Sequence, residues 1–291
     1  MVKDIFPGNL ASQPYLTAVG STLYFQASNG TNGYELWKSD GSADGTVMVK
    51  DINAGAADSS PSYLAVIGST LYFQAGDAAT GFELWRSDGS AESTVMVKDI
   101  NLGATSSTPS YLAAAGSTLY FQATDGLLGS ELWKSDGSAS GTVMVKDINL
   151  GASSSSPSYL AAIGTSIYFQ AGDGLVGSEL WKSDGSAEST VMVKDINLGA
   201  SSSSPSYLAA VGSTLYFQAG DGLVGSELWK SDGSASATVM VKDINSGAGS
   251  SSPAYLTAVG STLYFQAGDA SKGFELWKSD GSAETTAMVK Q

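Results

Sequence analysis

The stretch Glu35-Leu36-Trp37-Lys38-Ser39-Asp40-Gly41-Ser42 decides the fold, because it returns five more times with almost no change. Each copy contains one tryptophan, and consecutive tryptophans are 48 residues apart: Trp37, Trp85, Trp133, Trp181, Trp229 and Trp277. A fixed period of this length makes the repeat the structural unit. Six units fill the 291 residues, so we expect a single domain over residues 1–291.

Each unit is predicted to form four short strands joined by hairpin turns. In the second unit the strands are expected at residues 62–67, 70–75, 82–87 and 94–100. Val, Ile, Tyr, Phe, Trp and Thr fill these segments, while Gly, Asp, Ser and Pro fill the joints. Residues 76–81 form a loop, residues 101–109 lead into the next unit, and no segment has a helical period.

Runs of consecutive apolar residues favour one all-β architecture. In Leu71-Tyr72-Phe73, neighbouring side chains point to opposite faces of the sheet, so both faces must be covered. A two-layer sandwich covers only one face. We therefore predict an all-β, six-bladed β-propeller with four antiparallel strands per blade. A linear solenoid is the main alternative, but the first and last copies keep the same apolar residues instead of polar caps.

The two ends of the chain carry copies of one segment. Met1-Val2-Lys3 and Met288-Val289-Lys290 both match the fourth strand of the repeat. We predict that one copy completes the last blade and that the other is displaced or frayed. The sequence leaves open which copy does so, and whether the chain is a fragment of a longer array.

Composition excludes several partners. The chain has 14 Lys+Arg against 28 Asp+Glu, a formal charge of −14, which repels phosphate backbones and anionic membranes. We therefore expect no nucleic acid partner. The lack of cysteine excludes disulfides and thiolate metal sites. With no long apolar run and no apolar leader, we expect no membrane insertion, a soluble, unexported chain as given, and a monomer.

Catalysis is also disfavoured. The sequence contains no histidine, the usual general base, and its acids recur in similar copies instead of forming one distinct pair. We predict that the protein is not an enzyme. The Asp of each Ser-Asp-Gly turn is assigned to hairpin formation, since Asp-Gly favours such turns by itself. These residues are Asp40, Asp88, Asp136, Asp184, Asp232 and Asp280.

The repeat Glu-Leu-Trp-Lys-Ser-Asp-Gly-Ser, followed by Thr-Val-Met-Val-Lys-Asp-Ile, closely resembles the bacterial ELWxxDGT repeat family. The resemblance covers the whole chain, although all six copies have Ser, as at Ser42, where the family has Thr. It implies a β-propeller-like fold and an extracellular or cell-surface location, and it carries no general activity. Copies four and five differ at only six positions, for example Ile163 and Val211, which indicates recent amplification or engineering.

The loop between strands two and three is the candidate cation site. It presents an aspartate in five copies, Asp77, Asp125, Asp173, Asp221 and Asp269, and Asn29 in the first. By analogy with other propellers, we expect this loop and the Ser-rich connector to share one face of the ring. No cofactor is predicted, although calcium is the ion that such a loop could take.

One position breaks the symmetry of the repeat. Directly before Glu-Leu-Trp stand Tyr34, Phe82 and Phe274, whereas copies three to five have serine. On a closed ring these three blades are neighbours, so the aromatics would form one arc. Stacking of sugar rings on this arc competes with the simpler interpretation that the side chains pack over the blade edge.

Two kinds of repeated polar residue receive structural predictions. Gln74 and its copies are expected to be hydrogen-bonded within or between blades. Lys50 and Asp51, with their copies, are expected on the solvated outer edge, where charge discourages pairing between edges.

The favoured function is that of a non-enzymatic, multivalent recognition module for glycans or proteins. Six similar sites gain by avidity what each lacks in affinity. The alternative is a purely structural propeller, either a spacer in a surface protein or a symmetric array without a ligand.

Overall fold

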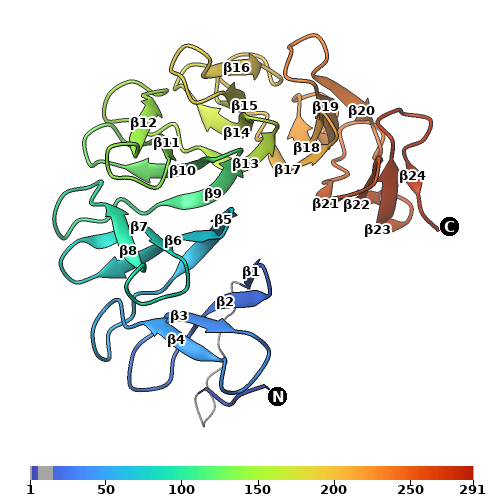
Figure 1. Cartoon of the computed structure of the whole chain (residues 1–291). Helices are drawn as coiled ribbons and strands as arrows, with labels where there is room; N and C mark the ends of the chain where they lie inside the picture. Colours follow the sequence, from blue (N-terminus) through green and yellow to red (C-terminus); the bar gives the residue numbers. More distant parts are fainter. Residues whose placement is uncertain (1, 6–15, 291) are drawn as a thin grey trace. The chain divides into compact units, whose positions relative to one another are not determined.

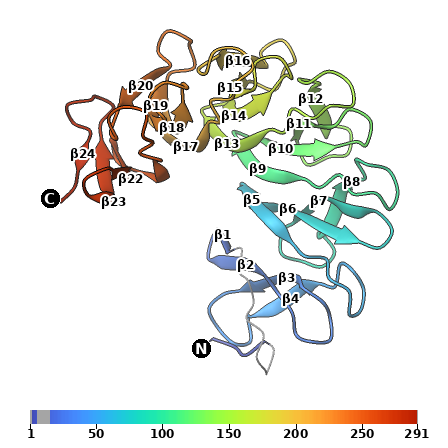
Figure 2. The same ribbon diagram turned by 180° about the vertical axis from the view of Figure 1, so that it is seen from behind.

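The computed structural model describes residues 2–5 and 16–290, which form strands and no helix. The strands make six antiparallel sheets of four strands each, and within every sheet the strands lie side by side in chain order. Figure 1 shows these sheets along the chain, and Figure 2 shows them from behind. The predicted six blades are confirmed. None of the described residues forms a helix with the length and hydropathy of a membrane span.

The chain divides into two compact units, Met1–Met144 and Val145–Gln291. The prediction of one domain over residues 1–291 stays a prediction. Three sheets begin in the first unit. They contain β1 (Thr17–Val19), β2 (Thr22–Ala27), β3 (Glu35–Ser39) and β4 (Val47–Lys50); β5 (Ser62–Ile67), β6 (Thr70–Asp77), β7 (Gly81–Ser87) and β8 (Val95–Lys98); and β9 (Ser110–Ala115), β10 (Thr118–Thr124), β11 (Ser130–Ser135) and β12 (Val143–Lys146).

The second unit contains the other three sheets. They consist of β13 (Ser158–Ile163), β14 (Ser166–Gly172), β15 (Ser178–Ser183) and β16 (Val191–Lys194); β17 (Ser206–Val211), β18 (Thr214–Gly220), β19 (Ser226–Ser231) and β20 (Val239–Lys242); and β21 (Ala254–Val259), β22 (Thr262–Asp269), β23 (Gly273–Ser279) and β24 (Ala287–Met288).

Consecutive sheets within a unit share an apolar layer. In the first unit, Leu71, Phe73 and Trp85 of the second sheet pack against Tyr24 and Ile52 of the first. The opposite face of the second sheet packs against the third in the same way, and the layer recurs in the second unit. Burial of each large apolar side chain contributes roughly 1.5–3 kcal/mol. The second sheet is therefore covered on both faces, as the apolar runs of the sequence predict.

Lysines add polar links between consecutive sheets. Lys38 Nζ donates to the carbonyl of Gly89 at 2.8 Å, and Lys50 Nζ donates to that of Thr94 at 2.7 Å. Asp51 Oδ2 accepts the Gly55 N–H at 3.1 Å. The prediction that Lys50 and Asp51 lie on a solvated outer edge is wrong, because both side chains are half-buried and hydrogen-bonded to the adjoining backbone. For Gln74 the prediction is confirmed, since its Nε2 donates to Ser62 Oγ at 3.2 Å.

The two end copies of the fourth strand differ in structure. The C-terminal copy forms β24 of the sixth sheet, where Met288 is paired with Trp277. Met1 lies outside the described residues, and residues 2–5 form no strand. Lys3 Nζ instead donates to the Thr46 carbonyl at 2.8 Å, and Ile5 packs against Phe25. Lys3 thus makes the same bond to the first sheet that Lys50 makes to the second.

Candidate functional site

A buried glutamate, the first residue of Glu-Leu-Trp, joins the third strand of the second sheet to the connector. Glu83 is fully buried, and its carboxylate accepts the N–H of Ile100 at 2.9 Å and that of Ser107 at 2.8 Å. Ser107 Oγ donates to the same carboxylate at 2.6 Å. Burial raises the pKa of Glu83 above its ordinary value, and the hydrogen bond from Ser107 opposes this shift. The glutamate therefore holds the connector against the sheet.

Loop and connector lie together, as predicted from the sequence. The N–H of Phe82 donates to Ser106 Oγ at 2.9 Å, and the N–H of Ser107 donates to the Phe82 carbonyl at 3.0 Å. In the second unit, loop and connectors line an open pocket of about 280 Å³ that includes Asn149, Ser154 and Leu175. This side of each sheet is hydroxyl-rich and shallow.

Each loop aspartate accepts hydrogen bonds from backbone N–H groups of its own turn. Asp77 Oδ1 accepts the N–H groups of Ala79 and Thr80, each at 2.8 Å. The equivalent bonds form at Asp125, Asp173, Asp221 and Asp269, and Asn29 makes them in the first copy. Within residues 2–5 and 16–290, no three acidic, histidine or cysteine side chains gather as metal ligands would. Each loop carboxylate thus accepts hydrogen bonds within its own turn, and calcium binding at this loop stays a prediction.

The three symmetry-breaking aromatics differ in their surroundings. Phe82 faces Gly76 across the β6–β7 hairpin, and a Cβ on that glycine would lie 3.0 Å from the ring. Phe274 faces Gly268 in the same way but is 60% exposed. Tyr34 is anchored through its backbone, whose N–H donates to Asp58 Oδ1 at 2.8 Å. The first two contacts favour edge packing for Phe82 and Phe274, and the predicted arc stays a prediction.

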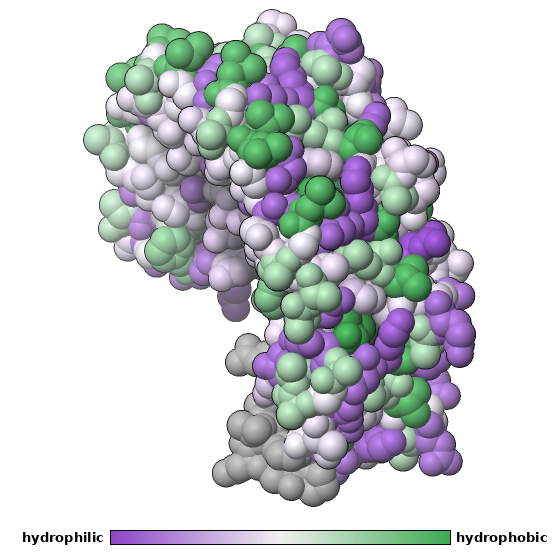
Figure 3. Space-filling view, turned by 90° about the vertical axis from the view of Figure 1, so that its left-hand side faces the viewer, coloured by the Kyte–Doolittle hydropathy of each residue, from purple (hydrophilic) through white to green (hydrophobic). Residues whose placement is uncertain are grey.

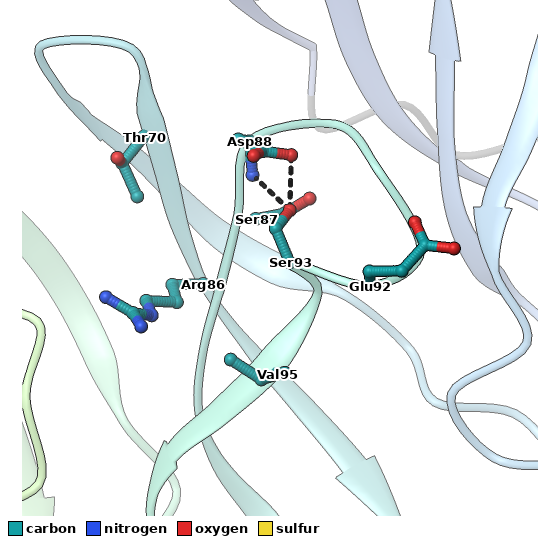
Figure 4. A pocket seen from close by; sticks show the side chains of 7 residues that line it. All are labelled: Thr70, Arg86, Ser87, Asp88, Glu92, Ser93 and Val95. Carbon is teal, nitrogen blue, oxygen red and sulfur yellow. Dashed lines mark hydrogen bonds between the residues drawn. The ribbon is translucent and has the colours of Figure 1, made fainter.

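A second pocket lies at the Ser-Asp-Gly turn of the second sheet, with a volume of about 360 Å³. Asp88 and Ser93 close the turn by two hydrogen bonds, drawn dashed in Figure 4. The Ser93 hydroxyl holds the pKa of Asp88 below its ordinary value. Arg86, the only arginine in the sequence, and Glu92 extend in opposite directions in Figure 4. This pocket therefore has no converging pair of charged groups that could act as acid and base.

A row of half-exposed tyrosines is the feature that the sequence analysis missed. Tyr159, Tyr207 and Tyr255 of the second unit follow one another with ring centroids 6.1 and 6.0 Å apart. Tyr63 and Tyr111 form the same contact in the first unit at 5.9 Å. Four of these five side chains are 38–40% exposed, and Tyr255 is 73% exposed. Each unit thus has its own row, of two tyrosines in the first and three in the second, and we use the name tyrosine row for each.

The backbone of the tyrosine row is strained in every described copy. The φ angles of its residues lie between 52° and 55°, a left-handed conformation that a bulky residue rarely adopts. The first strand of each of these sheets has an irregular register at this point, between Ser62 and Ala65 in the second sheet. Such a bulge re-aims a side chain. The sequence signal that could have revealed it is the Pro that precedes each of these tyrosines by two residues, as Pro61 precedes Tyr63.

The exposed tyrosines provide surfaces for contact with other groups. The phenol rings, tilted by 42–52° to one another, offer apolar faces with a polar tip, and the neighbouring segments supply serine hydroxyls. Since the sequence contains neither histidine nor cysteine, the usual nucleophile–base pairs cannot form.

No protein-family model and no curated protein matches the sequence. Solved structures match the fold at low sequence identity. A puromycin-hydrolysing peptidase of Mycobacterium tuberculosis aligns at 15% identity with a TM-score of 0.58, over 98% of this chain and 46% of the peptidase. The computationally designed Ika8 protein aligns at 13% identity with a TM-score of 0.56, over 97% of this chain and 78% of its own.

An uncharacterised protein of Listeria monocytogenes EGD-e aligns at 10% identity with a TM-score of 0.52, over 98% of this chain and 85% of that one. The chain spans less than half the length of the peptidase. These likenesses show the propeller-like fold and nothing about activity.

Proposed function

We propose that the protein is a non-enzymatic, multivalent recognition module that binds glycans. The observation that supports this proposal is the tyrosine row. Aromatic rings that are half-exposed, in contact with one another and held in a strained backbone conformation in every described copy are costly to maintain for folding alone. Sugar rings stack on such faces, and each further ring in a row adds avidity.

The resemblance to ELWxxDGT repeats supports placing this module outside the cell or at its surface, where glycans are abundant. The hydroxyl-rich side of each sheet, with its single loop carboxylates, is the place where calcium would assist binding. Proteins remain the second class of ligand.

A purely structural role is the competing proposal. It draws support from Phe82, whose ring covers Gly76, and from the similar hydrogen bonds that recur from copy to copy, such as those of Glu83 and Glu179. On this view the repeats serve as a spacer and have no ligand.

A glycan array, run with and without calcium, tests the proposal. Tyr159→Asn, Tyr207→Asn and Tyr255→Asn combined remove three rings while keeping a residue that tolerates positive φ. The matched control combines Tyr34→Ser, Phe82→Ser and Phe274→Ser, because copies three to five carry serine there. Loss of binding in the first variant alone supports the tyrosine row, and loss in the second alone supports the aromatic arc. No binding by the unmodified protein contradicts glycan recognition and favours the structural role.

A further inference from the structure

Six leucines are among the most exposed large apolar side chains of the protein. Each is between 75% and 82% exposed. They occupy one position in the connector and one position in the loop between strands two and three: Leu102, Leu127, Leu150, Leu175, Leu198 and Leu223. Exposed apolar side chains that are grouped on one side of a protein mark interaction sites. We call the four in the second unit, Leu150, Leu175, Leu198 and Leu223, the leucine surface.

The segments that carry these leucines lie next to one another along their unit. A Cβ on Gly174, next to Leu175, would lie 2.7 Å from Oδ1 of Asn149, which precedes Leu150. The same relation holds between Gly222 and Asn197, the neighbours of Leu223 and Leu198. Ala200, two residues after Leu198, lines the 280 Å³ pocket together with Leu175. Connector and loop leucines therefore alternate along one side.

Carboxylates lie in the loops that carry Leu175 and Leu223. Residues 172–178 and 220–226 contain Asp173 and Asp221 and no lysine or arginine. The connector carboxylates Asp147 and Asp195 each have a buried Oδ1. The whole chain carries a charge of −14. Figure 3, which draws one side of the molecule without identifying these leucines, shows hydrophobic side chains in green scattered among hydrophilic ones in purple over the surface in general. A partner for such a surface needs apolar side chains next to positive charges.

Folding does not require leucine at these positions. The loop position is occupied by Thr31, Ala79 and Ser271 in the first, second and sixth copies, and the connector position by Ala54 and Ser246. All five residues are exposed. The leucines are thus confined to neighbouring copies, where they carry no packing role.

We propose that the leucine surface binds a cationic, amphipathic segment of another protein. The apolar face of the segment covers the four leucines, and its lysines or arginines lie against the loop carboxylates Asp173 and Asp221. This surface shares no residue with the tyrosine row, so the inference does not rest on glycan binding.

Fluorescence anisotropy with a labelled synthetic peptide tests the inference. The probe is an amphipathic helical peptide of leucine and lysine, and the control probe has glutamate in place of every lysine. We expect the lysine peptide to bind and its affinity to fall about tenfold or more between low and high salt. Combined Leu150→Ser, Leu175→Ser, Leu198→Ser and Leu223→Ser should weaken binding at least about tenfold.

The matched control combines Val143→Ser, Val191→Ser and Val239→Ser, which removes exposed valines from the fourth strands and should leave binding unchanged. Equal binding of both probes, or equal effects of the two variants, would overturn the proposal. So would binding of zwitterionic phosphatidylcholine vesicles without binding of the peptide, or leucine-dependent self-association of the protein in sedimentation experiments. A glycan-array result has no bearing on any of these outcomes.

Discussion

Ser107 Oγ donates a 2.6 Å hydrogen bond to Oε2 of Glu83, which lies 24 residues earlier in the chain. Ser203 and Glu179 form the same pair at 2.5 Å. In both cases the carboxylate is fully buried and also accepts backbone N–H groups from the connector. The connector between consecutive sheets is thus held by one side chain of the Glu-Leu-Trp motif.

Glu83→Gln should destabilise the protein by at least about 2 kcal/mol. The amide NH₂ would face donors, and each buried N–H or hydroxyl left without an acceptor costs roughly 1–3 kcal/mol. Urea unfolding followed by tryptophan fluorescence measures the loss. The matched control is Glu275→Gln, because Glu275 is the same motif position but exposed, where we expect a change within about 0.5 kcal/mol. Equal losses in both variants would contradict this role of Glu83.

The turn carboxylates should determine the acid sensitivity of the fold. The Ser93 hydroxyl lowers the pKa of Asp88 below its ordinary value of 3.8, and the Ser189 hydroxyl does the same for Asp184. A lowered pKa means that the stabilisation is present above the ordinary value and is lost as pH falls through the lowered one. For Glu83 the stabilisation depends on pH in the opposite direction. Its raised pKa gives a contribution that is present below 4.5 and lost as pH rises through the raised value.

Asp→Asn at all six Ser-Asp-Gly turns should therefore make the free energy of unfolding decrease less steeply as pH falls below about 4. Asn-Gly still favours the hairpin, so the fold is retained at neutral pH. Urea midpoints measured as a function of pH for the variant and the unmodified protein provide the comparison. Parallel acid profiles would mean that other groups cause the acid sensitivity.

Strands were predictable from the sequence because their signal is local. The predicted segment 62–67 coincides with β5. The second strand was predicted to end at residue 75 but runs to Asp77, since Asp77 pairs with Gly81 and lengthens the hairpin. Gly76 and Asp77 have low strand propensity, and cross-strand pairing overrides it.

The site was less predictable, because its signals come from distant residues. Glu83 looks like a solvated charge in the sequence, and its donors lie 17 and 24 residues further on. The tyrosine row depends on a bulge that reverses the expected alternation of Tyr63 and its copies. Strand periodicity contains no information about such an irregularity.

Gly233→Ala should cost considerably more than Gly212→Ala, although both glycines have positive φ. Any Cβ at such an angle costs about 1–2 kcal/mol. A Cβ on Gly233 would also overlap the Tyr168 hydroxyl of the preceding sheet, whereas one on Gly212 meets nothing within 4 Å. Tyr168→Phe should recover part of the loss only in the Gly233→Ala background. Thermal unfolding of the three single variants and of the two double variants measures this coupling, and additive effects would contradict the contact.

Ile5→Ser should destabilise the first sheet selectively. Ile5 packs against Phe25, Ala27 and Trp37, so a hydroxyl there would uncover apolar surface and cost about 2 kcal/mol. Hydrogen exchange of β2 and β3 amides should become faster, while exchange of β18 and β19 in the second unit should stay unchanged. Val2→Ser is the control, because Val2 is 52% exposed. Equal acceleration in both variants would mean that the N-terminal residues contribute no specific packing, whereas a selective effect of Ile5 would identify residues 2–5 as a functional part of the first sheet's apolar layer.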